Sequence, residues 1–487
     1  MNAAIKRFTD SIESQAIPLS VVDTQGSFSN IPFVFFYKNT NNSADFMPKD
    51  VLHRSFYRAM EHCPFLAGRI EGRGRGNVRI VVDKDDINIP DYTEDTSDVH
   101  FSELKAAGFA WHAWPQGVAT TGPGPRADKN GEIKLINVHV VRLKDNSGVI
   151  IYVSIPHYAV DGEAHMEVIR RWCAICQLMV NGDEESIDKL PAFAFDRSCL
   201  LANLPKERTP MDSITEKVFT TPTIMSEWLA WVSPQTRGFI QGTIVKRQKA
   251  RTHLFRVSQA SFESLKSMLG EHLPNDHDIT INQVLLAITT KTLAQAHRSV
   301  ANEESKGWFN LDIFKSKEGT LPIGVVFETR KQLGLASGGY IGNVLMPNIV
   351  YKPLSEMEAT TTTESLAKTI AGFDELVGSI SAPLVASYID MVTPRPSSFT
   401  RPAMSFSFHK TAMTFIYDVM PDMYAADFGF GRPAWVSPNE PFRANAVLLL
   451  TGKDPKDGID VFMSTFPEAM DKVLKNEFWM SFAKKIY

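Results

Sequence analysis

The stretch Gly148-Val-Ile-Ile-Tyr-Val-Ser-Ile-Pro156-His157-Tyr-Ala-Val-Asp161-Gly162 carries most of the information about the fold. Its first eight residues form a nearly continuous β-branched run, which predicts a central strand buried on both faces. Pro156 has no backbone N–H for a strand ladder, so the strand is expected to stop there. Apolar residues recur at helical spacing from about Glu163 to Val180, which predicts a helix. A strand, a short turn and a helix therefore follow one another, with His157 on the turn.

His157 is a candidate general base because of this position. Rigid scaffolds commonly present reactive groups on loops at strand ends. Histidine exchanges a proton near neutral pH, as a general base must, and Gly162 allows backbone conformations that a side chain forbids. The residues alone leave two interpretations open. His157 is either catalytic, or it is structural and Asp161-Gly162 serves only as a turn or helix N-cap.

Elements of both kinds extend on either side of this stretch. Strands are predicted at 31–37, 78–82, 133–141, 253–257, 322–328 and 415–417, and helices at 49–63, 224–231, 258–269 and 280–297. A chain of 487 residues is too long for one compact core. We expect an α/β (α+β) protein with mixed sheets, divided into a first domain at 1–204, a crossover connection at 205–250 and a second domain at 251–487.

Composition argues against several classes of protein. Apolar residues make up 44% of the chain, charged residues 22%, and the net charge is -4, so general nucleic-acid binding is disfavoured. The absence of a long apolar run or a signal-like N-terminus predicts a cytoplasmic protein without a membrane span. Cys173-Ala-Ile-Cys176 is expected to be two thiols packed in a helix. No cysteine or histidine spacing indicates a metal site.

Five short motifs in collinear order resemble those of the BAHD acyltransferases, and most closely the fungal trichothecene-type O-acetyltransferases. They are Pro18-Leu-Ser20-Val-Val-Asp23, Cys63-Pro-Phe-Leu-Ala-Gly68-Arg69, His157-Tyr-Ala-Val-Asp161-Gly162, Tyr340-Ile-Gly342-Asn343 and Asp427-Phe428-Gly429-Phe430-Gly431. The last motif departs from the family's Asp-Phe-Gly-Trp-Gly because Phe430 replaces Trp, which keeps an aromatic ring and loses an indole N–H.

This resemblance implies a fold and an activity. The fold is two similar domains like chloramphenicol acetyltransferase, with a channel between them, His157 at its midpoint and residues 432–452 returning to the first domain. The activity is transfer of an acyl group from acyl-CoA, first of all acetyl-CoA, to a hydroxyl of an apolar secondary metabolite such as a terpenoid, polyketide or alkaloid. The enzyme would be a monomer without a bound cofactor, and His157 would be its general base.

The resemblance also implies roles for other residues. Asp161 is expected to pair with a buried arginine, for which Arg330 is the candidate, and to support the His157 turn together with Gly162. Thr414 is a candidate oxyanion donor, although an ordinary strand residue is the slightly favoured interpretation. The motif near the C-terminus is expected to be a structural turn made by Asp427, Gly429 and Gly431. The candidates for CoA binding are Ser258, Lys266 and Arg251, and the alternative for these three is that they are solvated surface residues.

Several alternatives stay open. An acceptor cavity could be lined by aromatic residues that the sequence does not separate from core residues, namely Phe33, Phe35, Phe36 and Trp111. A condensation-domain-like protein would take its acyl group from a carrier protein. Such domains usually show a second histidine directly before the catalytic one, where this chain has Pro156. A non-catalytic homologue would only bind a small molecule.

Overall fold

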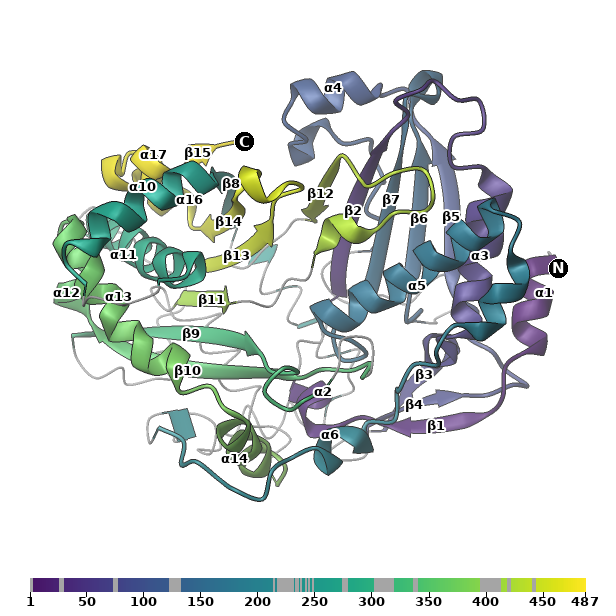
Figure 1. Cartoon of the computed structure of the whole chain (residues 1–487), viewed down its shortest axis with the longest axis horizontal. Helices are drawn as coiled ribbons and strands as arrows, with labels where there is room; N and C mark the ends of the chain where they lie inside the picture. Colours follow the sequence, from purple (N-terminus) through teal and green to yellow (C-terminus); the bar gives the residue numbers. More distant parts are fainter. Residues whose placement is uncertain are drawn as a thin grey trace.

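The computed structural model describes most of the chain and contains two large mixed sheets that lie side by side, each flanked by helices (Figure 1). This is the predicted α/β class with mixed sheets. The described residues are 3–25, 30–72, 78–121, 133–212, 249–273, 279–301, 319–335, 340–394, 413–417, 422–439 and 444–487, with isolated positions between 215 and 247. The helix predicted near 224–231 lies outside the described residues.

The smaller of the two large sheets is built around the predicted central strand. Its order is β12-β2-β7-β6-β5, and the strands are β12 (Trp435–Pro438), β2 (Asn30–Lys38), β7 (Gly148–Pro156), β6 (Asn137–Arg142) and β5 (Asp91–Thr96). Every residue of β7 is buried, as expected for a β-branched strand with a neighbour on each side. The strand predicted at 133–141 begins only at Asn137.

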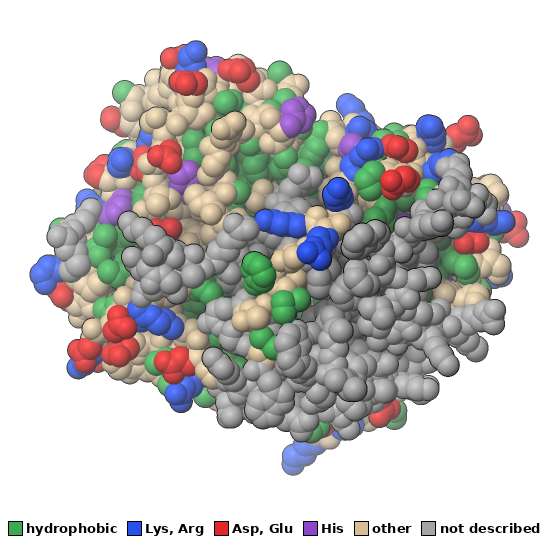
Figure 2. All heavy atoms as spheres, turned by 180° about the vertical axis from the view of Figure 1, so that it is seen from behind, with side chains coloured by type: hydrophobic (Ala, Val, Ile, Leu, Met, Phe, Trp, Pro, Cys, Tyr) green, Lys and Arg blue, Asp and Glu red, His purple; other side chains and the backbone are tan. Residues whose placement is uncertain are grey.

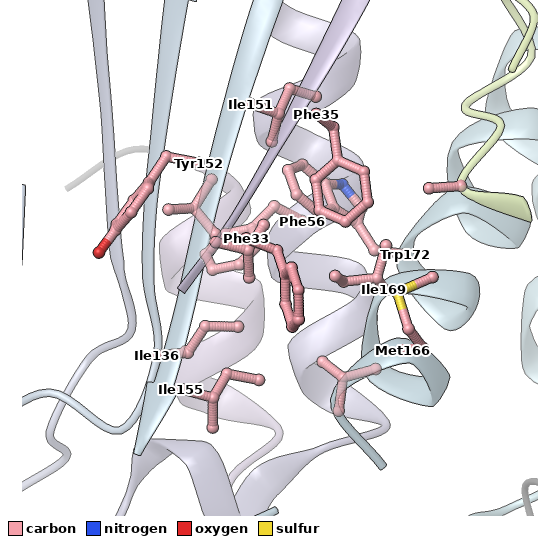
Figure 3. Close-up of a cluster of buried hydrophobic side chains, with 14 of the residues drawn as sticks. Phe33, Phe35, Phe56, Ile136, Ile151, Tyr152, Ile155, Met166, Ile169 and Trp172 are labelled. Carbon is pink, nitrogen blue, oxygen red and sulfur yellow. The ribbon is translucent and has the colours of Figure 1, made fainter. Parts of the chain in front are cut away.

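Helices α3 (Lys49–Glu61) and α5 (Gly162–Val180) pack against this sheet, with α1 (Ala3–Asp10) beside α3 (Figure 1). Figure 3 shows Phe33 and Phe35 of β2 pointing toward the side chains of Met166, Ile169 and Trp172 on α5. The apolar face of α5 therefore closes the first core. Cys173 and Cys176 are buried free thiols within α5.

A small antiparallel sheet and several short helices complete the N-terminal half. The sheet has the order β1-β4-β3. Its strands and the neighbouring short helices are β1 (Gln15–Pro18), β4 (Arg79–Val82), β3 (Arg69–Glu71), α2 (Val21–Gln25), η1 (Pro64–Ala67), α4 (Phe101–Ala106), η2 (Trp111–Ala113), η3 (Lys144–Asn146), η4 (Glu184–Lys189) and α6 (Ser198–Ala202).

The larger sheet belongs to the C-terminal half and has the order β10-β9-β11-β13-β14-β8-β15. Its strands are β10 (Leu345–Pro353), β9 (Thr320–Glu328), β11 (Met413–Tyr417), β13 (Ala446–Thr451), β14 (Ile459–Thr465), β8 (Arg251–Val257) and β15 (Lys484–Lys485). Its helices are α10 (Gln259–Gly270), α11 (Ile281–Ala301), α12 (Leu354–Glu358), α13 (Thr363–Gly378), α14 (Ala382–Val392), α16 (Pro467–Val473) and α17 (Glu477–Phe482), with the short turns η5 (Met423–Ala425) and η6 (Pro455–Asp457).

The two halves exchange structure near the C-terminus. Strand β12 pairs antiparallel with β2, with Trp435 opposite Phe36, so this part of the chain joins the first sheet. The segment that joins the first sheet is shorter than the expected 432–452, because β13 already lies in the larger sheet between β11 and β14. The Ala-Val-Leu-Leu-Leu run of β13 is buried, which suits a central strand of the larger sheet.

No helix in the described ranges is both long and apolar enough to cross a bilayer on its own, and the pair α13 and α14 passes that test only together, bent by 74°. On the face shown in Figure 2, acidic and basic side chains are mixed over the described surface. That part of the surface therefore presents no large field of one sign.

Candidate active site

His157 lies on the turn between β7 and α5, where the first sheet meets segments of the C-terminal half. We call residues 156–161 the His157 loop. Its neighbours Tyr158, Ala159, Val160 and Asp161 are at most 2% exposed, whereas His157 itself is partly exposed. The backbone on the C-terminal side of the imidazole is thus fixed by burial, while the imidazole remains accessible.

Asp161 holds this loop to the C-terminal half through Arg330. The guanidinium donates two hydrogen bonds to the Asp161 carboxylate, at 2.8 and 2.9 Å. The same carboxylate accepts from the backbone N–H of Ala164 at 3.0 Å and of Val344 at 2.9 Å. Both interpretations of Asp161 therefore hold at once, since it caps α5 and pairs with a buried arginine.

Arg330 in turn reaches two further groups. It donates to the carboxylate of Glu328 at 2.8 Å and to the carbonyl of Gly342 at 2.6 Å. Burial by itself lowers the pKa of Arg330, but the carboxylates of Asp161 and Glu328 outweigh that effect and raise its pKa above the ordinary value. Burial raises the pKa of Glu328, against the opposing effect of Arg330. This cluster links β9, the His157 loop and the segment at 340–344.

Asn343 is the direct partner of His157. The Nδ1 of His157 lies 3.0 Å from Oδ1 of Asn343, and Nδ2 of Asn343 donates to the main-chain oxygen of His157 at 2.8 Å. Asn343 is 1% exposed. The imidazole is therefore held from one side through Nδ1, and Nε2 is the ring nitrogen left for a substrate. Asn343 ends the fourth of the five motifs, but no role was predicted for it.

A second buried arginine supports the loop from the other side. Arg197 donates to the carbonyl of Ala159 at 2.7 Å, and its Nε lies 3.6 Å from the Asp23 carboxylate. A Cβ atom at Gly342 would lie 1.9 Å from Nη1 of Arg197, so any larger residue there would displace this guanidinium. Neither Arg197 nor Asp23 was predicted as a site residue, although Asp23 closes the first of the five motifs.

His165 is a further histidine near the site that the sequence did not single out. It lies on the first turns of α5, is fully buried, and packs on Phe33 with 5.5 Å between ring centroids. Within the described part of the chain, neither of its ring nitrogens has a hydrogen-bond partner. Burial lowers the pKa of His165 to about 3, and the charge of His157 acts in the same direction. His165 is therefore uncharged near neutral pH.

Thr414 lies in β11, between β9 and β13, with Gly324 and Ala446 opposite it. Thr414 is buried, and its backbone N–H donates to the carbonyl of Asn445 at 2.8 Å. This position is that of a strand residue in the larger sheet.

The residues considered for CoA binding lie in β8 and in or just before α10, next to the edge strand β15 of the larger sheet. The hydroxyl of Ser258 accepts from the backbone N–H of Ser261 at 3.1 Å and so caps α10. Arg251 pairs with Asp471 at 2.5 Å, and Lys266 lies on α10. In Figure 1, α10 flanks the larger sheet on the side away from β7 and α5. The structure does not bring these three residues to His157.

The aromatic residues considered for an acceptor cavity are packed inside the protein. Phe33 and Phe35 lie in the core under α5 (Figure 3). Phe36 packs on the rings of Phe109 and Trp114, at 5.4 and 5.2 Å between centroids. The three phenylalanines are at most 2% exposed, so they line no open wall.

Trp111 instead connects the two halves. Its indole N–H donates to the carbonyl of Pro438 at 3.0 Å, and its ring contacts Phe462 of β14 and Tyr487 at the C-terminus.

The motif at 427–431, called here the Asp427 turn, lies away from His157. One carboxylate oxygen of Asp427 accepts from the N–H groups of Gly429 and Gly431, at 2.8 and 3.0 Å. Both glycines have φ near +95°, at +94° and +97°, a region that favours glycine. The ring of Phe428 is buried against Trp172 and Tyr37. The turn thus anchors the chain on α5 and β2 just before β12.

Among the described residues there is no group of three or more His, Cys, Asp or Glu side chains arranged to hold a metal ion.

Comparison with known proteins identifies the fold and the family. Residues 7–235 and 311–479, most of the chain, match the model of the Transferase family. F. graminearum TRI101 complexed with coenzyme A and T-2 mycotoxin is similar in structure, with a TM-score of 0.71 and 15% identity over 97% of this chain and 100% of that chain. Vinorine synthase has a TM-score of 0.56 and 12% identity over 96% of this chain and 97% of its own.

The first condensation domain of the CDA synthetase shares the fold as well, with a TM-score of 0.51 and 12% identity over 96% of this chain and 95% of that domain. No curated protein sequence matches the chain significantly. The similarity to these structures shows the two-domain fold, and the family match covers both halves of the chain, including His157 and Arg330. The chain therefore belongs to the Transferase family and is an acyltransferase of the BAHD type.

Proposed function

We propose that this protein transfers an acyl group from acyl-CoA to a hydroxyl of an apolar small molecule, with His157 as the general base. The observation that carries the proposal is the fixed imidazole: Nδ1 is held by Asn343 at 3.0 Å, on a loop that the buried Asp161–Arg330 pair connects to the C-terminal half. A general base needs one ring nitrogen positioned and the other open to the acceptor.

The proposed reaction is a direct transfer between two bound substrates. The Nε2 of His157 takes the proton of the acceptor hydroxyl, and the oxygen attacks the thioester carbonyl. The tetrahedral oxyanion then collapses, the C–S bond breaks, and the imidazolium returns the proton to the CoA thiolate. The products are an ester and free CoA, so protons balance and His157 is regenerated.

The oxyanion needs hydrogen-bond donors placed before the reaction. Thr414 remains the candidate from the chain's own residues. Its hydroxyl would have to face the thioester carbonyl bound beside His157. Asp161 has no step in this chemistry, because its carboxylate is occupied by Arg330 and two backbone N–H groups.

Acyl-CoA as donor is supported by the family and by the structure of TRI101, which was crystallised with coenzyme A and T-2 mycotoxin. Acetyl-CoA is the first donor to try, and hydroxylated terpenoids, polyketides and alkaloids are the first acceptors. Pro156 stands directly before His157, which favours this reading over a condensation domain, where a second histidine usually precedes the catalytic one.

A thiol-release assay tests the proposal. The protein is incubated with a panel of acyl-CoAs and hydroxylated metabolites, and free CoA is followed with a thiol reagent, with an acyl-loaded carrier protein as a parallel donor. We expect CoA release that depends on an acceptor and no transfer from the carrier protein. Transfer only from the carrier protein would favour a condensation-type enzyme, and binding without release from either donor would favour a non-catalytic homologue.

A further inference from the structure

Asp23 lies behind Asn343 as seen from His157, and it is fully buried. Its Oδ1 accepts from both the backbone N–H and the side-chain Nδ2 of Asn343, at 2.8 and 3.0 Å. Its Oδ2 accepts from the backbone N–H and the hydroxyl of Ser20, at 2.8 and 2.7 Å. Both carboxylate oxygens are therefore committed to donors, and one of them is committed to the residue that holds His157.

These contacts determine which way the Asn343 amide points. The atom placed as Nδ2 lies within 3.0 Å of a carboxylate oxygen of Asp23 and 2.8 Å of the main-chain oxygen of His157. Both neighbours are acceptors only. A flipped amide would place its own oxygen against two oxygens and lose two hydrogen bonds. The amide oxygen must therefore face Nδ1 of His157.

The amide orientation determines the tautomer of His157. An amide oxygen only accepts, so Nδ1 of His157 must carry the hydrogen in the 3.0 Å contact. In a neutral imidazole the other nitrogen, Nε2, then has the free lone pair. We infer that Asp23 sets the tautomer of His157 through Asn343, which makes Asp23 and Asn343 positioning residues for the base. The inference rests on the proposed role of His157.

Arg197 is part of the same hydrogen-bond and ion-pair network. Its Nε lies 3.6 Å from Asp23, and its Nη2 holds the carbonyl of Ala159 in the His157 loop. Arg197 is 4% exposed, and its positive charge lies beside the buried carboxylate of Asp23, so the two charges balance each other inside the protein. The ion pair and the loop are thus held by one guanidinium, and this fixes Asp23 relative to His157.

This arrangement differs from a Ser-His-Asp triad, in which the carboxylate contacts the imidazole itself. Here a neutral amide stands between them, so no proton can pass from His157 to Asp23 through it in a single transfer. The carboxylate acts only by orienting the amide.

Nuclear magnetic resonance of the ring nitrogens tests the tautomer directly. The protein is labelled with ¹⁵N-histidine, and the His157 signals are identified as those missing in His157→Ala. We expect wild-type His157, when neutral, to carry its hydrogen on Nδ1. Asn343→Leu and Asp23→Ala should each shift the equilibrium toward Nε2–H. Hydrogen on Nε2 in the wild type overturns the inference, whether or not either variant folds.

A matched control separates this effect from general loss of a buried charge. Asp460 is 2% exposed and pairs with Arg256 at 2.6 and 2.9 Å, away from the His157 loop. We expect Asp460→Ala to leave the His157 ring signals in the wild-type tautomer. A tautomer shift in Asp460→Ala as large as in Asp23→Ala would contradict a specific role for Asp23, as would an unshifted tautomer in folded Asp23→Ala.

A double-mutant cycle on kcat completes the test once an acyl-CoA and an acceptor are in hand. Asn343→Leu should lower kcat about tenfold to 10²-fold, part of the 10²–10⁴ that a general base contributes, with little change in KM. Because Asp23 acts through Asn343, adding Asp23→Ala should lower kcat no further. Additive losses would overturn the inference. Its failure is distinct from that of the proposed function, since the tautomer is measured without turnover.

Discussion

The His157 loop and the Asp427 turn are the two most prominent motifs of the chain, and each contains an aspartate with a glycine one or two positions after it. Asp161 is fully buried and paired with an arginine from the other half of the chain, whereas Asp427 is partly exposed and its carboxylate accepts from the backbone N–H groups of Gly429 and Gly431. The first aspartate joins the two halves through an ion pair, and the second shapes the backbone of its own turn at 427–431. Two aspartates in equally prominent motifs therefore have different roles, and the difference follows from their burial and from the charge of their partners.

The largest expected effect is at the buried pair. Asp161→Ala would leave the Arg330 guanidinium buried without its main partner and should lower the free energy of unfolding by about 3–5 kcal/mol. Activity should fall as well, because the His157 loop loses its tie to β9. Urea unfolding followed by circular dichroism measures the loss.

The double variant Asp161→Ala/Arg330→Leu provides the control. It removes the stranded charge together with its partner, so it should be less destabilised than Asp161→Ala alone. Wild-type stability in Asp161→Ala would remove the distinction between loop and turn.

An intermediate effect is expected at His165, on the helix that leaves the loop. Its pKa is lowered to about 3 in the folded protein, against about 6.5 in an unfolded chain. The unfolded state therefore binds a proton that the folded state does not, so stability falls as pH drops below about 6.5, by up to about 1.4 kcal/mol per pH unit.

His165→Leu removes this titration. Its free energy of unfolding should decline less steeply than that of the wild type between pH 6 and pH 4.5, a range set by the lowered pKa. The other histidines are common to both proteins and cancel in the difference. Parallel pH profiles for the two proteins would show that His165 is protonated in the folded state.

The smallest effect is expected at the Asp427 turn. Asp427→Ala removes two hydrogen bonds to partly solvated backbone and should cost about 0.5–2 kcal/mol, as the loss of a helix cap does. With the remaining fold intact, kcat should stay within about twofold of the wild type. Measured side by side, Asp161→Ala should lose much more stability and activity than Asp427→Ala. A loss of kcat in Asp427→Ala without a loss of stability would contradict the structural role of the turn.

The sequence predicted local structure well where one element carries a strong pattern. The buried run of β7, the apolar period of α5 and the stop at Pro156 follow from residues that are neighbours in the chain. The pairing of Asp161 with Arg330 came only through the family resemblance. The shorter return of the chain at β12 was not foreseen, since four residues carry too little pattern to assign a strand to a sheet.

The supports of His157 escaped prediction for a related reason. Asn343 is 186 positions from His157, and Asp23 is 320 positions from Asn343. Nothing in a single sequence indicates that these groups meet, and the cluster exists only once two sheets are packed. Arg197 shows the same limit, because nothing in the sequence indicates that an isolated arginine between η4 and α6 is buried. Gly342, Asn343 and Asp23 each stand in one of the five motifs, and the close approach of Arg197 to Gly342 gives a structural reason for a glycine there.

The proposed role of His157 as the base for acyl transfer is tested most directly by the rate of ester formation by His157→Ala with an active acyl-CoA and acceptor pair. In the described part of the chain the His157 side chain has a hydrogen bond to Asn343 but no buried ion pair like that of Asp161, so the variant should remain folded. We expect kcat to fall by about 10²–10⁴-fold while the protein remains folded. An equal rate in His157→Ala and the wild type would contradict it.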